Sequence, residues 1–348
     1  MRYKNSGVDF AAAASAKASI KRLARWTFGP QVLGELGAFG GFYALGGLLR
    51  DGVLVASMDG VGTKLKIAFA LNRHRTVGAD LVNHCVNDIV VHGAAPLFFL
   101  DYLATGRLRP RVAEQIVEGI ARACRETGCS LIGGETAEMP GFYPPHEYDL
   151  AGCIVGWVRR SRIVDGSRIR PGDCIIGLPS LGLHTNGYSL ARKVLLEHAG
   201  LRLARRVPEL GRTLGEELLA PHRCYSPALR PLLGKGWLNG LVHVTGGGIT
   251  DNTPRILPVG CKAEFALGAW PGLPIFDLIA RLGRVPQDEM LRTFNMGLGM
   301  LLVVAENNLG RVTTALKKQR ERFWLVGRIA RGKPGVEYKT RLKLPALG

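Results

Sequence analysis

Short apolar runs alternate along the chain with longer stretches that have a helical period. Apolar runs bounded by glycine, proline and polar residues are typical of strands, and apolar positions three and four residues apart indicate helices. The pattern predicts strands over 53–56, 97–100, 131–132, 151–158, 174–178, 241–244, 300–304 and 323–329. It predicts helices over 77–91, 111–126, 188–198, 250–256 and 309–319. This alternation indicates an α/β (α+β) fold, although tight strand–helix–strand spacing is missing in places, so a plain doubly wound sheet is not assured.

A polar, turn-rich stretch over 163–173 divides the chain into parts of similar size. The length of 348 residues fits two ordinary domains, and we predict them over 1–168 and 169–348. A hydrophobic content of 47% with 21% charged residues is typical of a folded protein, not of a disordered one. A core of this size needs neither disulfides nor a structural metal.

The net charge of +18 is concentrated at the two ends of the chain. The first 25 residues hold six basic residues and one acidic residue, and the last 38 hold eleven and two. Background composition explains this excess, and a polyanionic partner is the alternative. The basic ends lack interleaved aromatic residues and any zinc-finger or RNA-recognition signature, so we predict no specific nucleic acid partner.

Cellular location follows from the cysteines and the apolar runs. The seven cysteines include no C-x-x-C pair, which favours reduced thiols in a cytoplasmic enzyme over a zinc site or a disulfide framework. No apolar run reaches 18 residues and no signal peptide is visible, so we expect no membrane association.

The sequence DGVGTK (59–64) directly follows a predicted strand. Gly60 and Gly62 would allow backbone N–H groups to approach a ligand, Asp59 offers a carboxylate for Mg²⁺, and Lys64 offers a charge for a phosphate. A simple turn with a surface ion pair fits this hexapeptide equally well.

A polar stripe marks the predicted helix over 77–91. Asp80, His84 and Asp88 are four residues apart and therefore share a face, with Asn83 and Asn87 beside them. Aspartate and asparagine are poor helix formers, so a stripe of them predicts a function, and oxygen donors suit Mg²⁺ that bridges phosphates. The alternative is a network of capping or interhelix hydrogen bonds.

Three further glycine-rich motifs follow strands. GGETAEMPG (133–141) offers Glu135 and Glu138 for a metal or for base chemistry, or it is a glycine-rich bulge or turn. HTNGYS (184–189) combines Thr185 and Asn186 with a helix start, which suits an anion but also an ordinary helix cap. HVTGGG (243–248) ends a strand in a glycine loop. Together the motifs predict Mg²⁺–nucleotide chemistry with a second phosphorylated ligand.

In this order the motifs resemble the aminoimidazole ribonucleotide synthetase family. The resemblance rests on DGVGTK, CVND (85–88), PLFFLDYLATG (96–106), GGETAEMPGFY (133–143), HTNGYSL (184–190), HVTGGG and FNMGLGM (294–300). It implies a two-domain PurM-like fold, in which the N-terminal half contributes to a β-barrel between the subunits of a homodimer and the C-terminal domain is an α/β sandwich.

The resemblance also implies a reaction. The family closes the ring of formylglycinamidine ribonucleotide to 5-aminoimidazole ribonucleotide in purine biosynthesis, with ATP and Mg²⁺. An O-phosphorylated imidate forms, an amidine nitrogen attacks, and ADP and phosphate are released. A small-molecule kinase of the same superfamily is the alternative enzyme.

The resemblance assigns roles to specific residues. The implied metal ligands are Asp59, Asp88 and Glu135. The implied nucleotide-binding residues are Gly37, Gly40, Asp59, Gly60, Gly62, Thr63, Lys64, Asp80 and Asn87. The implied substrate-binding residues are Glu135, Thr136, Thr185, Asn186, Gly246, Gly247 and Gly248. The implied catalytic residues are Lys64 and either His184 or His243 as the proton shuttle, because imidazole titrates near neutral pH.

Overall fold

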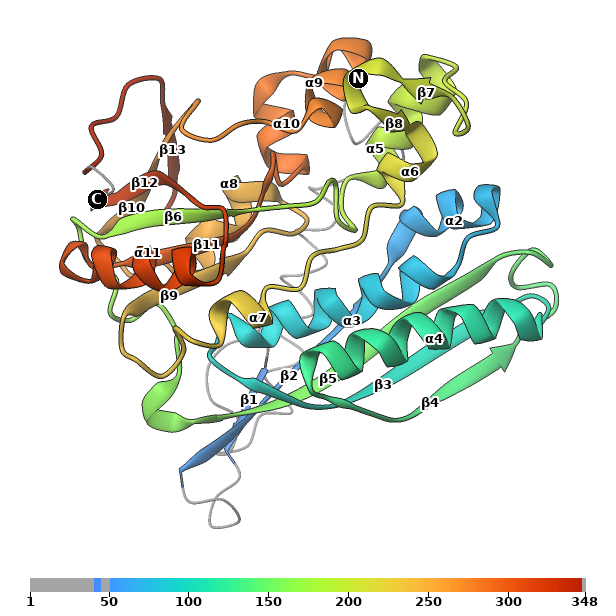
Figure 1. The fold of residues 1–348 in the computed structure, drawn as a ribbon, viewed down its shortest axis with the longest axis horizontal. Coiled ribbons are helices and arrows are strands. Elements are labelled where there is room, and N and C mark those ends of the chain that lie inside the picture. Colours follow the sequence, from blue (N-terminus) through green and yellow to red (C-terminus); the bar gives the residue numbers. More distant parts are fainter. Residues whose placement is uncertain (1–40, 45–50, 346–348) are drawn as a thin grey trace.

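The computed structural model describes residues 41–44 and 51–345. The predicted nucleotide-binding residues Gly37 and Gly40 lie outside the described residues. Two large sheets with helices packed on them, and a small sheet of two strands, make up the described chain (Figure 1).

The first sheet has five strands in the order β1-β2-β5-β3-β4. These strands are β1 (Gly41–Ala44), β2 (Gly52–Gly60), β5 (Tyr148–Arg159), β3 (Ala95–Thr105) and β4 (Ser130–Glu138). Their pairs are antiparallel except that β3 and β4 run parallel. The helices α3 (Arg75–Val90) and α4 (Pro110–Thr127) lie together on one face of this sheet (Figure 1).

Glycine allows α3 and α4 to approach closely. A Cβ atom on Gly78 would lie 2.1 Å from the carbonyl oxygen of Ile116, and one on Gly119 would lie 2.0 Å from that of Arg75. A side chain at either position would therefore push the helices apart. The close packing holds α3 against the sheet and so fixes the position of its polar stripe.

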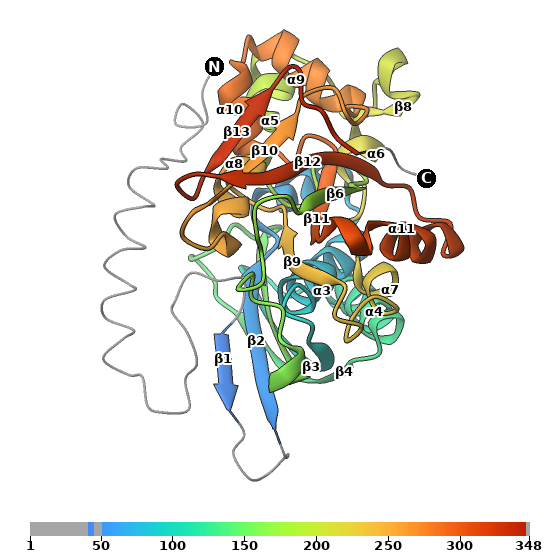
Figure 2. The same ribbon diagram turned by 90° about the vertical axis from the view of Figure 1, so that its left-hand side faces the viewer.

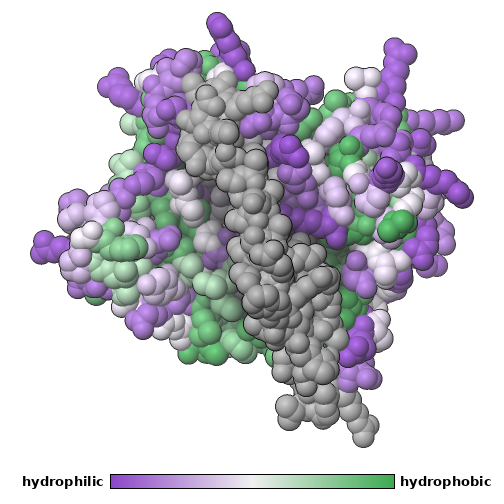
Figure 3. Space-filling model, turned by 180° about the vertical axis from the view of Figure 1, so that it is seen from behind, coloured by the Kyte–Doolittle hydropathy of each residue, from purple (hydrophilic) through white to green (hydrophobic). Residues whose placement is uncertain are grey.

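The other face of the first sheet carries exposed hydrophobic side chains. Along β3, Phe99 and Leu103 are buried, whereas Leu100 and Tyr102 between them are exposed, as the alternation of a strand requires. Met58 on β2 is 66% exposed, which is unusual for a large apolar side chain. The rear of the molecule shows hydrophobic surface on both sides of the grey atoms (Figure 3). In the single chain this sheet is open, so the predicted barrel between subunits stays a prediction.

The second sheet has six strands in the order β13-β10-β12-β6-β11-β9. These strands are β13 (Val336–Lys339), β10 (Cys261–Ala266), β12 (Trp324–Arg331), β6 (Cys174–Pro179), β11 (Leu298–Val304) and β9 (Leu238–His243). β11, at 0% exposure over most of its length, runs through the core of this half. The two sheets are joined through residues 160–173, and the predicted division after residue 168 lies within this connection.

Helices surround the second sheet, and Figure 2 shows them from the side. They are α5 (Tyr188–Arg192) with the π-helix Lys193–His198, α8 (Gly248–Asn252), α9 (Pro274–Gly283), α10 (Gln287–Thr293) and α11 (Leu309–Lys318). The chain also contains three short helices, α2 (Leu65–Leu71), α6 (Leu214–Leu218) and α7 (Ser226–Leu229), and a small antiparallel sheet of β7 (Arg206–Val207) and β8 (Arg212–Thr213).

Each predicted strand and helix is present in this structure, so the mixed α/β prediction is confirmed. The pattern missed five strands and five helices: β1, β7, β8, β10, β13, α2, α6, α7, α9 and α10. It also ended one strand too early, because β4 continues through the glycine-rich GGETAE to Glu138. None of the seven cysteines forms a disulfide. Among the described residues, no helix is long and apolar enough to cross a membrane.

Candidate active site

The polar stripe of α3 faces the second half of the chain. Asp80, His84 and Asp88 share this face, as predicted, and all three side chains are buried, with exposures of 0%, 3% and 5%. The loop after β2, the loop before α5, the end of β9 and the segment between α6 and α7 meet here. Figure 1 shows that last segment running along α3.

His84 joins the DGVGTK motif to the HTNGYS motif. Its Nε2 atom lies 2.8 Å from Oδ2 of Asp59, and its Nδ1 atom lies 2.8 Å from Oγ1 of Thr185. Burial alone would lower the pKa of His84, but the carboxylates of Asp59, Asp88 and Asp80 outweigh it and raise that pKa to about 9. His84 is therefore an imidazolium at neutral pH and donates both of these hydrogen bonds.

His243, at the end of β9, is bonded to the far end of the same stripe. Its Nδ1–H donates to Oδ1 of Asp88 over 2.7 Å, and Ser57 donates to Oδ2 of the same carboxylate over 3.0 Å. Both carboxylate oxygens of Asp88 are thus occupied. Burial lowers the pKa of His243, although Asp88 opposes this effect, so His243 is neutral at neutral pH.

A histidine that the sequence did not reveal completes the cluster. His222 is fully buried, with Nε2 2.9 Å from Nε2 of His243 and Nδ1 3.1 Å from Oγ1 of Thr185. Burial next to other cations holds the pKa of His222 well below its usual value. No glycine loop or acidic stripe surrounds His222 in the sequence, so no local signal marked it.

The predicted shuttle His184 stacks on His222, with ring centroids 4.1 Å apart. Its backbone has the left-handed φ of 62°, and its Nε2 accepts a hydrogen bond from the N–H of Leu181 over 3.3 Å. Its Nδ1 atom is buried and has no partner among the described residues. Burial keeps the pKa of His184 far below its usual value, so the ring is neutral.

Lys64 and Asp80 bind each other in the interior of the chain. They form an ion pair of 2.7 Å in which both side chains are 0% exposed. Lys64 also donates to the carbonyl of Ala220 over 2.7 Å, and Oδ1 of Asp80 accepts the N–H of His222 over 2.6 Å. In the described chain these bonds anchor the segment between α6 and α7. The predicted contact of Lys64 and Asp80 with the nucleotide stays a prediction.

The two asparagines of the stripe anchor the same segment. Asn83 donates to the carbonyl of His222 over 2.8 Å. Asn87 donates to the carbonyl of Arg223 and accepts the N–H of Tyr225, both over 2.8 Å. A buried segment outside any sheet must still pair its backbone polar groups, and these amides do so. The structure thus shows, for Asn87, the hydrogen-bond network that was the alternative for this stripe, and the predicted contact of Asn87 with the nucleotide stays a prediction.

The three carboxylates predicted to hold Mg²⁺ are not brought together. Glu135 on β4 pairs with Tyr102, which lies on the sheet face without helices, whereas Asp59 and Asp88 lie on the helix face. The described side chains that do gather are His84, Asp88 and His243, within 4.8 Å, but imidazole–carboxylate hydrogen bonds already occupy them. Asp59 and Asp88 both lie near Nε2 of His84, at 2.8 and 4.0 Å, whereas Glu135 lies apart on β4, so the predicted metal set stays a prediction. Thr136, next to Glu135, is exposed on the same edge strand.

The predicted phosphate loops of the second half do lie together. A Cβ atom on Gly246 would be 3.3 Å from Oδ1 of Asn186, so GGG and HTN are in contact. The Nδ2 atom of Asn186 is buried without a partner among the described residues. Gly247 and Gly248 have left-handed φ values of 100° and 59°, which favour glycine.

The glycine loop of the first half meets the same region. Oγ1 of Thr63 lies 3.1 Å from Oγ of Ser189. The N–H of Gly60 donates to Oδ1 of Asp59 over 2.7 Å, and Gly62 has a left-handed φ of 66°. Burial opposes ionisation of Asp59, but His84 and these hydrogen bonds lower its pKa, so it is ionised. Its side chain is 41% exposed, which makes it the accessible end of the cluster.

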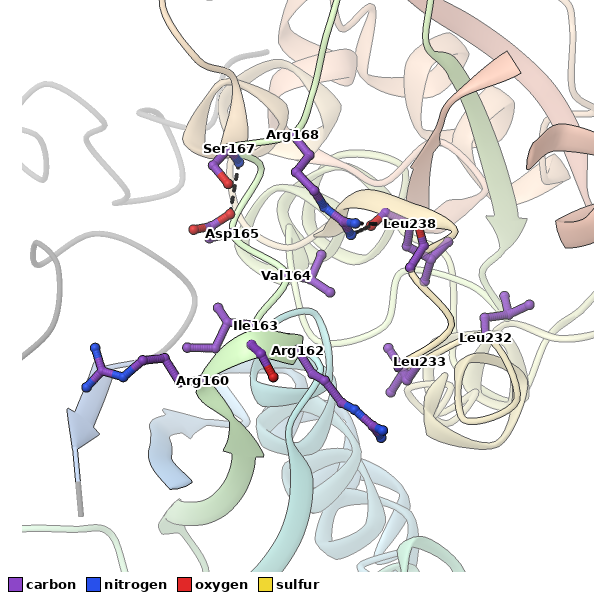
Figure 4. A pocket seen from close by; sticks show the side chains of 13 residues that line it. Arg160, Arg162, Ile163, Val164, Asp165, Ser167, Arg168, Leu232, Leu233 and Leu238 are labelled. Carbon is purple, nitrogen blue, oxygen red and sulfur yellow. Dashed lines mark hydrogen bonds between the residues drawn. The ribbon is translucent and has the colours of Figure 1, made fainter. Parts of the chain in front are cut away.

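A separate cavity of about 470 Å³ lies at the connection between the sheets, away from these residues (Figure 4). Arg160 and Arg162 line it but point apart, and Arg168 already donates to the carbonyl of Leu238. Its cationic groups do not converge on one ligand position. The histidine cluster, where the two halves meet, is therefore the candidate active site.

The histidine cluster lies at the junction of the two halves of the chain. The fold and this junction define a class of two-domain proteins, and family models match both halves. The C-terminal domain of "AIR synthase related protein" matches residues 170–339, and its N-terminal domain matches 45–158. Three bacterial relatives bear the name phosphoribosylformylglycinamidine cyclo-ligase. That of Myxococcus xanthus is 53% identical over 95% of this chain and 96% of its own, and that of Trichlorobacter lovleyi is 52% identical over 94% of each. That of Geobacter sulfurreducens is 49% identical over 96% of this chain and 97% of its own. The chain belongs to the phosphoribosylformylglycinamidine cyclo-ligase family.

Solved structures with the same fold are more distant in sequence. AaThiL complexed with AMPPCP and TMP has a TM-score of 0.66 at 15% identity, covering 94% of each chain. The thiamine-monophosphate kinase of Stenotrophomonas maltophilia K279a has a TM-score of 0.63 at 19% identity, covering 91% of this chain and 94% of its own. T. maritima PurL complexed with AMPPCP has a TM-score of 0.53 at 18% identity, covering 80% of this chain and 40% of its own. These likenesses show the fold alone.

Proposed function

We propose that this protein uses ATP to close the imidazole ring of formylglycinamidine ribonucleotide. The products are 5-aminoimidazole ribonucleotide, ADP and phosphate. The observation that carries the proposal is identity of about half of all positions with cyclo-ligases along nearly the whole chain. The junction supports it, because two glycine loops, an accessible carboxylate and four histidines meet there.

The reaction has two chemical needs, and the junction offers residues for both. Phosphoryl transfer to the formamide oxygen needs positioning and charge stabilisation more than covalent catalysis. Backbone N–H groups of Gly62, Gly246 and Gly247 are suited to phosphates, because glycine allows close approach. Ring closure then needs a group that removes a proton from the attacking amidine nitrogen. Asn186, whose buried amide lacks a partner, is suited to hold the substrate.

ATP is the proposed co-substrate, and the shared fold of structures complexed with AMPPCP is consistent with this. Mg²⁺ would enter bound to the nucleotide phosphates, and Asp59, Asp88 and Glu135 remain its proposed protein ligands. We also propose a cytoplasmic homodimer that covers the exposed face of the first sheet, where Met58, Leu100 and Tyr102 lie.

A product assay tests the activity. Purified protein is incubated with ATP, Mg²⁺ and formylglycinamidine ribonucleotide, and the aminoimidazole is detected by diazo coupling while ADP is measured in parallel. We expect aminoimidazole and ADP in equal amounts. Release of ADP without the aminoimidazole would favour a small-molecule kinase and would reject the proposal.

A further inference from the structure

Two cysteines lie together where helix α4 ends. The backbone N–H of Cys129 donates to the carbonyl of Cys124 over 2.9 Å, and that of Gly128 donates to the carbonyl of Arg125 over 3.3 Å. Gly128 follows the helix with a left-handed φ of 77°, which glycine adopts without strain. These bonds form a Schellman motif, in which the side chains at the positions of Cys124 and Cys129 commonly contact each other.

Both thiols of this motif lie in the interior of the protein. Cys124 is 2% exposed and Cys129 is 7% exposed. Sγ of Cys129 lies 3.5 Å from Oγ1 of Thr127, and the Thr127 hydroxyl donates to the carbonyl of Ala123 in the same turn. A pair of thiols at these positions packs as an apolar pair would, and in addition it can be oxidised.

The two thiols differ in their acidity. The Cys124 thiol donates a hydrogen bond to the sulfur of Cys129, and this bond lowers the pKa of Cys129 to about 7 against the effect of burial. The same hydrogen bond, together with burial, raises the pKa of Cys124 well above its usual value. Because the thiolate is the nucleophile in cysteine chemistry, Cys129 is the reactive thiol of the pair. Cys124 is its neutral neighbour.

Three other cysteines behave in the opposite way. Burial raises the pKa of Cys153, Cys174 and Cys224. A thiol with a raised pKa is mostly protonated at neutral pH and reacts slowly with oxidants. An oxidant should therefore select Cys129 over these three thiols.

We propose that Cys124 and Cys129 form a dithiol site that hydrogen peroxide oxidises to an intrachain disulfide and that thiol reductants restore. The backbone hydrogen bond of 2.9 Å joins the two residues directly, so closing the disulfide requires rotation of the side chains and no movement of the helix. The adjacent thiol captures the sulfenic acid of Cys129 before this acid is oxidised irreversibly to a sulfinic acid. The site uses no residue of the histidine cluster, so it goes beyond the proposed function and does not depend on it.

The atoms and electrons balance in two steps. The Cys129 thiolate attacks one oxygen of hydrogen peroxide, and the O–O bond breaks with its electron pair on the other oxygen, which takes a proton and leaves as water. Sulfur is thereby oxidised to the sulfenic acid, and the peroxide is reduced. The Cys124 thiol then attacks this sulfur, the S–S bond forms, and the S–O bond breaks. The sulfenic oxygen leaves as water with the proton of Cys124. A thiol reductant reverses the oxidation by thiol–disulfide exchange.

Peptide mapping of the full chain tests the disulfide. The protein is treated with hydrogen peroxide at neutral pH, and its remaining thiols are alkylated before digestion. Trypsin cuts after Arg125, which places Cys124 and Cys129 on different peptides, and protease Glu-C cuts after Glu135, which separates Cys129 from Cys153. Mass spectrometry should show the two peptides joined, with a mass two hydrogen atoms below their sum. Dithiothreitol should separate them.

Three results of this map would overturn the proposal. Cys124 and Cys129 could both stay reduced, Cys129 could become a sulfinic acid without the link to Cys124, or it could be linked to Cys224 instead. Cys174, which is 1% exposed and has a pKa raised to about 11, serves as the internal control. We expect Cys129 to be oxidised at least about tenfold faster than Cys174. Equal rates would contradict a reactive Cys129.

Two matched variants separate the roles of the thiols. In Cys124→Ala the sulfenic acid of Cys129 should persist, so that dimedone labels it, and more peroxide should convert it to the sulfinic acid. In Cys129→Ala the remaining Cys124 should stay reduced under the same treatment. Equal labelling of the two variants by dimedone would contradict the assigned roles. The map of the wild-type protein needs neither variant, so it decides the proposal even if one of them fails to fold.

Discussion

Replacing Lys64 by methionine separates an anchoring role from a contact with phosphate. The change keeps most of the side-chain volume but removes the charge from a pair of 2.7 Å in which both partners are 0% exposed. Asp80 would remain a buried carboxylate without its counter-charge, which costs about 3–5 kcal/mol. The carbonyl of Ala220 would also lose its donor, which costs about 1–3 kcal/mol if no water replaces it.

Urea denaturation of wild type, Lys64→Met and the double variant Lys64→Met/Asp80→Asn gives the free energies of unfolding. We expect the single variant to lose at least about 3 kcal/mol. The double variant should recover most of this loss, because asparagine has no charge and still accepts the N–H of His222. If Lys64→Met kept wild-type stability and only raised the KM for ATP, the buried-anchor role would be refuted and the predicted phosphate contact supported.

Three further changes test single features of the fold and the site. The pKa of His84 is raised to about 9, so its hydrogen bonds stabilise the folded protein fully below about pH 6.5, and this stabilisation is lost as the pH rises through 9. The free energy of unfolding, measured as a function of pH, should show this loss in the wild type but not in His84→Gln. Asn87→Ala leaves the Arg223 carbonyl and the Tyr225 N–H unpaired and should cost about 1–3 kcal/mol in urea denaturation; a neutral result would mean that these groups are not buried. In Gly248→Ala a Cβ atom would lie 2.1 Å from the carbonyl oxygen of Leu291, so we expect thermal unfolding at a clearly lower temperature than in the control Gly211→Ala. In that control the φ of 67° is also left-handed, but nothing lies within 4 Å of the added Cβ atom.

The sequence was informative where structure depends on neighbouring residues. Spacing placed Asp80, His84 and Asp88 on one helix face, and apolar runs located most strands. Which strands pair, and in which direction, depends on contacts far apart in the chain, so the strand order and the mostly antiparallel pairing of the two large sheets could not be predicted from those runs.

The contacts of the polar stripe could not be predicted from the sequence. Spacing shows which residues share a face but not what lies opposite, and opposite Asp80 and Asn87 lies backbone of 222–225. The motif GGETAEMPG was left open between a ligand site and a glycine-rich bulge or turn, and Gly134 lies within β4, where a Cβ atom would be 2.2 Å from the side chain of Asp101. Buried aspartate, asparagine and glycine residues can serve either the packing of the chain or the binding of a ligand. Only the groups that each residue contacts distinguish these two roles.

Isotope transfer tests most directly whether ATP activates the formamide oxygen for ring closure. Substrate labelled with ¹⁸O in the formyl group is converted with ATP and Mg²⁺, and the inorganic phosphate is analysed by mass spectrometry. If the oxygen is phosphorylated and leaves with phosphate, each aminoimidazole formed should be matched by one ¹⁸O atom in phosphate. Aminoimidazole formed with unlabelled phosphate, and with ¹⁸O released as water, would contradict the proposed activity.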